Sequence, residues 1–322
     1  MNFRTAGLTT LLAISCAGLA ALLSSCGQER AIVLGFSQAG VEGAWRTANS
    51  DSIKAAAERN GIQLHFADAG AGQEEQIIAL RSFIAQRVDV IAFTPVVETG
   101  WDTVLREAKK AGIPVVLTER DVRGSDRSLY TTMLGSDFVE QGRNAGRWLL
   151  ENTLGRSGQT NIVELRGTEG SWLSVDRGRG FQEIIATDPH FQIVRSESGN
   201  FTRAGGKSAM KALLAAEGRG IRVVYAHNDE MALGAIQALE EARLRPGQDI
   251  TIISVDGIRG AFEAMVAGKL NVTVESNPLI GPQLMGVVKD VVAHRRLPHR
   301  LVVEEFTFPK ELALETLPTR KY

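Results

Sequence analysis

The chain has 322 residues, which is enough for two domains that each bury a hydrophobic core. Hydrophobic residues make up 44% of the chain and the formal net charge is −1. This composition is typical of a globular protein and gives no reason to expect binding to nucleic acid or to an anionic membrane surface. The five histidines show no metal-ligand spacing, so we expect neither a metal nor another cofactor.

The N-terminus has the pattern of a secretion signal. Arg4 precedes a mildly apolar stretch over residues 6–23, which is short for a membrane span. The stretch ends in Leu23-Ser24-Ser25-Cys26, which resembles a bacterial lipobox. We therefore predict a lipoprotein signal peptide over residues 1–25 and acylation of Cys26. An ordinary cleaved signal and an uncleaved anchor are the alternatives.

Cys26 would be the first residue of the mature chain. The other cysteine, Cys16, lies inside the predicted signal, so no disulfide can form within the mature chain. Two or more acyl chains would hold the protein at a membrane stably. We expect a periplasmic or cell-surface location with a lipid anchor.

The first half of the mature chain alternates short apolar runs with helical patterns. We expect helices ending near Asn60-Gly61 and over residues 73–86 and 101–111. We expect strands over residues 31–36, 63–68, 90–93 and 113–118. The order β-α-β-α-β-α-β favours a doubly wound parallel sheet.

The pattern then restarts. Helices are expected over residues 137–152, 176–186, 203–216 and 231–242, and strands over residues 161–165, 191–196, 223–225 and 251–255. Val223-Val224-Tyr225 and its downstream pattern match the pattern that follows Val90-Ile91-Ala92-Phe93, which indicates a second lobe of the same topology.

The C-terminal tail is too short for a third core. It carries strand patterns at 272–275 and 302–306 and a helix pattern at 280–294. We expect it to cross back and form a hinge of several strands. The prediction is two doubly wound parallel-sheet α/β lobes, the N-terminal lobe comprising residues 26–136 and 277–300 and the C-terminal lobe residues 137–276 and 301–322.

Polar and aromatic residues follow the predicted strands. In open parallel sheets, ligands bind beyond the carboxyl ends of the strands. Carboxylates, amides and guanidinium groups suit sugar hydroxyls, and flat rings suit the apolar face of a sugar. The alternative is that these residues cap helices and form surface ion pairs, with Asp229 and Asp137 as N-caps. The candidate ligand-binding residues are Ser37, Gln38, Trp45, Arg46, Glu119, Arg120, Asp176, Arg177, Asn200, Phe201, Arg203, Asn228, Asp256 and Glu275.

Enzyme motifs are incomplete, and we predict no catalytic residue. The run from Gly35 to Ala39 lacks the second glycine of G-x-S-x-G, and Gly206-Lys207-Ser208 lacks the earlier glycine of a P-loop. A glycosidase would need paired carboxylates such as Glu119 and Asp256, but no signature of such an enzyme accompanies them. His227 follows a strand and fits either the cleft or a hydrogen-bonded structural role.

Several segments at these strand ends resemble the type I periplasmic sugar-binding proteins of ABC transporters, and most closely their galactofuranose-binding branch. The resemblance covers nearly all of residues 31–322. The segments that carry it are Gly35-Phe36-Ser37-Gln38, Gly43-Ala44-Trp45-Arg46, Arg81-Ser82-Phe83-Ile84-Ala85-Gln86, Pro95-Val96-Val97, Ala226-His227-Asn228-Asp229, Val255-Asp256-Gly257 and Thr273-Val274-Glu275.

The resemblance implies the periplasmic binding protein type I fold and a monomer that delivers a monosaccharide to an ABC permease. A sugar sensor that partners a receptor kinase or chemoreceptor is the alternative function. Lactose-repressor-type regulators share the fold, but a signal peptide stands here where their helix-turn-helix would be. Glu119, Asn200 and Trp172 depart from the family pattern. The implied roles are stacking by Trp45 and Phe201, donation by Arg46, Arg120 and Arg177, hydroxyl binding by Asn228 and Asp256, and a polar contact near the hinge by Glu275.

Overall fold

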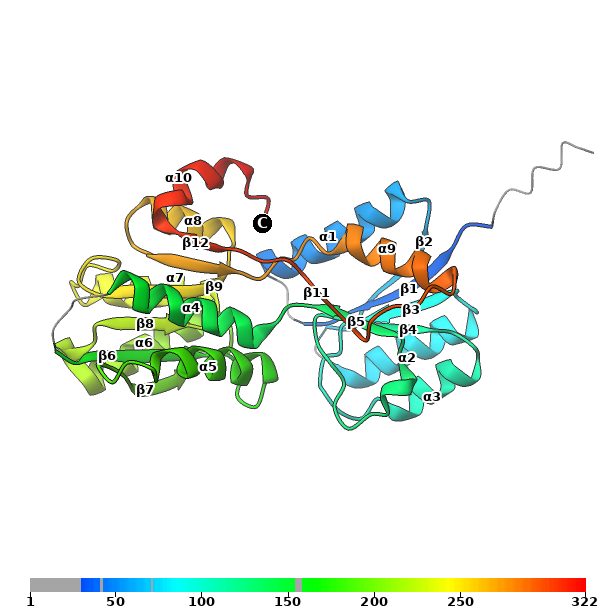
Figure 1. The fold of residues 1–322 in the computed structure, drawn as a ribbon, viewed down its shortest axis with the longest axis horizontal. Helices are drawn as coiled ribbons and strands as arrows, with labels where there is room; N and C mark the ends of the chain where they lie inside the picture. The colour runs from blue at the N-terminus through cyan, green and yellow to red at the C-terminus, as the bar shows by residue number, and fades with distance from the viewer. Residues whose placement is uncertain (1–29, 41–42, 71, 154–157) are drawn as a thin grey trace, which may run out of the picture. The chain divides into compact units, whose positions relative to one another are not determined.

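The structure is a computed structural model that describes residues 30–40, 43–70, 72–153 and 158–322. A compact unit over Ile32–Tyr322 contains two six-stranded sheets, each with helices on both faces (Figure 1). The predicted fold class is confirmed. In the described ranges, every helix is too short or too polar to span a membrane. The predicted signal peptide and Cys26 lie outside the described residues.

The first sheet has the strand order β11-β5-β4-β3-β1-β2, and all of its pairings are parallel. Every residue of β3 and β4 is buried, as expected for central strands that helices cover on both faces. The strands are β1 (Val33–Gln38), β2 (Gln63–Asp68), β3 (Val90–Phe93), β4 (Val115–Thr118), β5 (Thr132–Gly135) and β11 (Arg300–Val302).

Two apolar clusters cover the two faces of this sheet. Side chains alternate along a strand, so Val90 and Ala92 join one cluster and Ile91 and Phe93 join the other. The first cluster packs under α1 (Ala44–Arg59) and α9 (Gly281–Val292), and the second packs under α2 (Gln73–Ala85) and α3 (Asp102–Lys110). The sheet, these four helices and the two clusters make up the N-terminal lobe.

The second sheet has the order β12-β10-β9-β8-β6-β7 and is parallel except for β12 against β10. Its strands are β6 (Thr160–Arg166), β7 (Phe191–Ser198), β8 (Val223–Ala226), β9 (Thr251–Asp256), β10 (Val272–Glu275) and β12 (Thr307–Pro309). The helices of this C-terminal lobe are α4 (Phe138–Asn152), α5 (Trp172–Ile185), α6 (Arg203–Glu217), α7 (Asp229–Glu241), α8 (Arg259–Val266) and α10 (Ala313–Thr316).

Within the described residues, three segments carry the chain from one sheet to the other. Residues 136–137 lead from β5 to α4, residues 276–280 lead from β10 to α9, and residues 303–306 lead from β11 to β12. The last segment makes β12 antiparallel, because the chain enters the second sheet from the opposite end. These three crossings form the connection between the lobes.

One expectation about the strands was wrong, and one strand was not identified from the sequence. The tail was expected to hold one strand over residues 302–306, but β11 and β12 flank that stretch, and residues 303–306 belong to the crossing. Glu304 and Glu305 interrupt the apolar run there. The sequence pattern also identified no element between residues 118 and 137, where β5 lies. Its four residues are too few to show a sequence period, and their neighbours β4 and β11 bury them.

Candidate functional site

In the N-terminal lobe, Arg46 and Glu119 form the centre of a polar cluster at the strand ends. Arg46 lies in the first turn of α1, and Glu119 follows β4. Two nitrogens of Arg46 donate to the two carboxylate oxygens of Glu119, at 2.6 and 3.1 Å. Arg46 also donates to Gln38 Oε1 at 3.0 Å, and Arg120 Nε donates to Glu119 at 3.3 Å. Four predicted site residues therefore meet in one network.

The environment of Glu119 keeps its carboxylate charged. Only 9% of the Glu119 side chain is exposed, and 11% of that of Arg46. Burial alone would raise the pKa of Glu119, but Arg46 and Arg120 outweigh burial and hold the pKa below its ordinary value. The cluster is thus a paired, desolvated set of charges rather than a solvated surface ion pair.

Ser37 lies deeper than the other predicted residues of this lobe. It is fully buried at the end of β1, and its hydroxyl accepts a hydrogen bond from Gln76 Nε2 at 3.2 Å. The same nitrogen donates to the carbonyl of Thr94 at 2.9 Å, and Gln76 Oε1 accepts from the Val96 N–H at 3.0 Å. Gln76, which the sequence reading missed because it lies inside a helix, joins the ends of β1 and β3.

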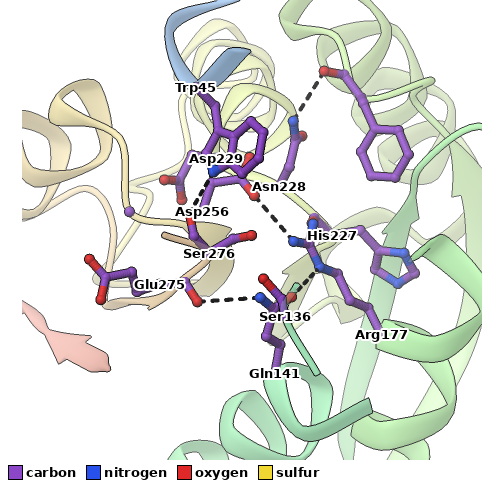
Figure 2. Close-up of polar contacts among 12 residues, drawn as sticks. Trp45, Ser136, Gln141, Arg177, His227, Asn228, Asp229, Asp256, Glu275 and Ser276 are labelled. Atoms are coloured by element: carbon purple, nitrogen blue, oxygen red, sulfur yellow. Dashed lines mark hydrogen bonds and ion pairs between the residues drawn. The ribbon is translucent and has the colours of Figure 1, made fainter. Parts of the chain in front are cut away.

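Trp45 lies beside Arg46 at the start of α1. The Arg46 guanidinium is 4.9 Å from the centre of the Trp45 ring. The indole Nε1–H donates to the carbonyl of Ser276 in the second crossing, at 2.5 Å (Figure 2). Trp45 also packs against the core of the C-terminal lobe. This ring therefore lies where α1, a crossing and the second lobe meet.

In the C-terminal lobe, Arg177 is the centre of a second polar cluster. Its side chain is 2% exposed. Nε donates to Gln141 Oε1 at 2.8 Å, Nη1 to the carbonyl of His227 at 2.5 Å and Nη2 to Asp256 Oδ1 at 3.3 Å (Figure 2). α4, α5 and the ends of β8 and β9 each contribute a group. Arg177 and Asp256, two predicted residues, are therefore brought together.

Asp256 ends β9 with its side chain 14% exposed. Burial raises the pKa of Asp256 above its ordinary value, and the charges of Asp229 and Glu119 raise it further, although Arg177 acts in the opposite direction. Asp256 belongs to the C-terminal lobe, whereas Glu119 belongs to the N-terminal lobe. A carboxyl group in this position can donate or accept a hydrogen bond.

Backbone strain is concentrated at the predicted site. Among the described residues, seven non-glycine residues have positive φ, and four of these are predicted site residues. The four are Glu119 (+63°), Asn200 (+51°), Phe201 (+58°) and Asp256 (+123°). Such conformations persist where the surrounding structure imposes them, and they cluster at binding and catalytic sites. They turn these strand-end residues away from the path of a regular strand.

Asn228 and Phe201 are joined to each other. Asn228 Nδ2 donates to the carbonyl of Phe201 at 3.1 Å, and Asn228 Oδ1 accepts from the Met231 N–H at 3.0 Å as the N-cap of α7. The Phe201 ring lies against Gly167, where a Cβ atom would collide with it. Asn228 thus holds both the start of α7 and the backbone that carries the ring.

The alternative role as a helix cap is half confirmed. Asp137 is the N-cap of α4, accepting from the Glu140 N–H at 3.1 Å. Asp229 was expected to cap α7, but it is the first residue of that helix and is fully buried. Its carboxylate accepts hydrogen bonds from the hydroxyls of Ser254 and Thr273 and from the Ile258 N–H. Asp229 therefore fixes the backbone that follows Asp256.

The structure places three other predicted residues outside the two clusters. Asn200 is exposed and accepts a hydrogen bond from Ser198 at 3.2 Å. Arg203 is exposed and forms an ion pair with Glu230 at 2.8 Å. Asp176 is partly exposed and pairs with Arg179, at 3.0 Å, on the same helix.

Glu275 is engaged by the C-terminal tail. Its Oε1 accepts from Arg320 Nη1 at 2.6 Å and from the Tyr322 hydroxyl at 2.9 Å, and its side chain is 6% exposed. The Arg320 guanidinium also lies 4.6 Å from the Phe262 ring and 4.7 Å from the Phe308 ring. The position near the crossings is as expected, but the polar partner is this chain's own tail, which sequence spacing could not reveal.

His227 has the structural role that we weighed for it. Its Nδ1 is 3.1 Å from Ser174 Oγ and its Nε2 is 2.9 Å from Glu164 Oε1. Burial lowers the pKa of His227, although Glu164 opposes the shift. These three side chains line a cavity of about 340 Å³, together with residues of α5 such as Gly178. In the described ranges, no group of His, Cys, Asp and Glu is arranged to hold a metal ion.

A second link between the lobes was not foreseen. Glu98 follows β3, and its Oε1 accepts the Trp172 N–H at 3.0 Å, at the start of α5. The Arg123 guanidinium lies 2.9 Å from the centre of the Trp172 ring and 4.0 Å from Glu98. Trp172 was noted in the sequence only as a departure from a family pattern, and the structure gives it a partner from the other lobe.

Comparisons with known proteins agree with this architecture. The model of the family described as "Periplasmic binding protein domain" matches residues 34–294. The chain is 41% identical, over 306 residues, to galactofuranose-binding protein YtfQ of Escherichia coli (strain K12), covering 94% of this chain and 96% of the relative.

Two solved structures are similar over most of their length. A crystal structure from Mycobacterium smegmatis in complex with β-D-fucofuranose is 49% identical with a TM-score of 0.84, covering 89% of this chain and 94% of that chain. The periplasmic binding protein component of the arabinose ABC transporter from Shewanella sp. ANA-3, bound to α- and β-L-arabinofuranose, is 46% identical with a TM-score of 0.85, covering 90% and 95%.

Proposed function

Because this chain belongs to the periplasmic binding protein domain family, we propose that it is an extracytoplasmic solute-binding protein that captures a neutral furanose sugar and delivers it to an ABC importer. Its relatives support the sugar class, since their names and complexes refer to galactofuranose, fucofuranose and arabinofuranose. We further propose that it acts as a monomer whose lobes close about the three crossings.

The observation that carries the proposal is the pairing of charges in the two clusters. Arg46 and Arg120 bond to Glu119, and Arg177 bonds to Asp256. Glu119 already has two cationic partners and Asp256 has one, so a cationic ligand would bring an unpaired charge into a desolvated place, which is costly. A polyhydroxyl ligand can instead donate to the carboxylates and accept from the guanidinium groups.

We propose distinct roles for the strand-end residues. The arginines and Asp256 would bond hydroxyl and ring oxygens, and Trp45 and Phe201 would pack on the apolar faces of the sugar. Asn228 and Gln38 would hold these groups in place through the contacts described above. Burial of the arginines before the ligand arrives reduces the entropy lost on binding.

Calorimetric titration tests the ligand class. D-galactose and L-arabinose solutions contain furanose forms, whereas methyl galactopyranoside is locked in the six-membered ring and galacturonate carries a charge. We expect binding of the first two sugars with a dissociation constant of about 1 μM or tighter. Tighter binding of the locked pyranoside would refute the furanose assignment. Binding of galacturonate without binding of any neutral sugar would refute the neutral ligand.

We also propose that Cys26 carries the lipid that holds the protein at a membrane. The support is the Leu23-Ser24-Ser25-Cys26 boundary after an apolar stretch. Cys26→Ala should release a soluble form or leave the precursor unprocessed, and fractionation followed by mass spectrometry of the N-terminus measures both. Unchanged processing and unchanged membrane association would contradict the anchor.

A further inference from the structure

Glu305 lies in the third crossing and bonds to the other two. Its Oε1 accepts the Ser136 hydroxyl of the first crossing at 2.5 Å and the Asn277 N–H of the second crossing at 3.1 Å. Its Oε2 accepts from Gln141 Nε2, on α4, at 2.8 Å. One half-buried carboxylate therefore links the three crossings to one another. The same carboxylate also bonds to the first turn of α4.

The bond from Gln141 has a consequence for Arg177. A side-chain amide has one end that donates and one end that accepts, whereas a carboxylate only accepts. Glu305, together with the Glu275 carbonyl that the same Nε2 reaches at 3.5 Å, therefore holds the amide with Nε2 toward these acceptors and Oε1 toward Arg177, whose Nε donates to that oxygen at 2.8 Å (Figure 2 shows Gln141 beside Arg177). The reversed amide would point a donor at the Arg177 Nε–H.

We propose that Glu305 is a positioning residue that sets the orientation of Arg177 through Gln141 and so links the conformation of the crossings to the ligand-binding guanidinium. The inference rests on the proposed function for the meaning of Arg177, but the relay itself is a property of the chain. Arg177 is buried, so water cannot replace the Gln141 oxygen as the acceptor of its Nε–H if that bond is lost. Loss of the acceptor would therefore shift the guanidinium away from Asp256.

Glu305→Gln isolates this relay from the general role of the crossing. The glutamine Oε1 can still accept from Ser136 and Asn277, so those two bonds persist. Its Nε2 would face the Gln141 amide, which must then reverse to offer its oxygen. The Arg177 Nε–H is left without an acceptor. We expect about a 10-fold loss of affinity for D-galactose, corresponding to one charge-assisted hydrogen bond.

The double variant Glu305→Gln/Gln141→Glu restores a matching donor and acceptor at each contact between residue 305, residue 141 and Arg177. The new glutamine donates to the new glutamate, whose other oxygen accepts from Arg177, and the net charge is that of the wild type. We expect affinity near the wild-type value. Glu304→Gln is the matched control, because this neighbouring glutamate in the same crossing is exposed, and it should leave affinity unchanged.

Two measurements are made on each variant: calorimetry with D-galactose, and the Arg177 Nε–H resonance by NMR in the ligand-free protein, assigned with Arg177→Lys. The resonance should shift in Glu305→Gln and return in the double variant. An unshifted resonance in Glu305→Gln, or a double variant that recovers neither readout, would overturn the relay.

If wild type binds no neutral sugar, the proposed function fails while the NMR comparison still decides the inference. If Glu305→Gln does not fold, a folded double variant with near wild-type readouts supports the relay, and an unfolded one overturns it.

Discussion

Arg46 and Arg81 form two arginine–glutamate pairs that each have two hydrogen bonds but differ in burial. Arg46 bonds Glu119 through two nitrogens at 2.6 and 3.1 Å, with the side chains 11% and 9% exposed. Arg81 bonds Glu107 through two nitrogens, both at 2.9 Å, with the side chains 52% and 39% exposed. Replacing each arginine by methionine keeps most of the aliphatic stem and removes only the charge and the hydrogen bonds.

We expect Arg46→Met to lower the free energy of unfolding substantially. Breaking a buried ion pair by removal of one partner costs about 3–5 kcal/mol, because the other charge is left desolvated. Arg120, at 3.3 Å from Glu119, remains and offsets part of this cost. The estimate is therefore about 2–4 kcal/mol at neutral pH. For a folded unit of this size, that corresponds to a fall in Tm of about 3–7 °C.

The difference between wild type and Arg46→Met should depend on pH. In the wild type, the pKa of Glu119 is held below its ordinary value of 4.5, so Glu119 stabilises the fold above that pH and the contribution is lost as the pH falls through the lowered pKa. Without Arg46, burial would raise the pKa, and the charged form would destabilise the fold above pH 4.5. The difference should therefore grow from pH 4 to pH 7.

Urea unfolding followed by circular dichroism at pH 4, 5, 6 and 7 measures this difference. Arg81→Met is the control, and it should change stability little at any of these pH values, because exposed pairs are screened by solvent. Equal effects of the two substitutions at pH 7, or an effect of Arg46→Met that does not vary with pH, would refute the reasoning. Arg46→Met should also lose affinity for furanose sugars, since Arg46 is a proposed donor.

Three further predictions rest on other parts of the structure. Asp229→Ala leaves three buried donors unpaired and should lower the unfolding free energy by about 3 kcal/mol or more in urea; a loss below 1 kcal/mol would contradict it. Gly142→Ala should destabilise the protein, since the new Cβ would lie 2.1 Å from the Arg177 carbonyl oxygen. Gly286→Ala places its Cβ in open space and should stabilise the protein by up to about 1 kcal/mol. Equal effects of the two substitutions on Tm would rule out this packing argument. Trp172→Ala removes the ring that Arg123 covers and so weakens the second link between the lobes. The ligand-free protein should then have a larger radius of gyration by small-angle scattering, and an unchanged radius would show that this link does not hold the lobes together.

The sequence by itself was sufficient for the architecture. Short apolar runs alternating with helical patterns predict parallel sheets, because buried strands lack the period-two polar alternation. Two such blocks predict two lobes, which the two six-stranded sheets confirm. Strand-end position selected Glu119 and Asp256 as candidates, and Arg46 and Arg177 were selected from the segments that follow strand ends.

Only the tertiary structure decided which polar side chains bond to each other. Asn228 and Asp229 are adjacent and both suit a helix cap, yet Asn228 takes that role and Asp229 is buried among donors from β9 and β10. Glu275 looked available to a ligand until the tail placed Arg320 on it, 45 residues away along the chain.

The positioning residues are a further case that the sequence could not decide. Gln141 lies 36 residues from Arg177 and 164 from Glu305; Gln141 fell inside a predicted helix, and Glu305 fell inside a predicted strand rather than after one. Sequence patterns report the local periods that secondary structure imposes. Hydrogen bonds between distant segments depend on where the lobes and their crossings bring those segments in space, and that is fixed only when the whole core has packed.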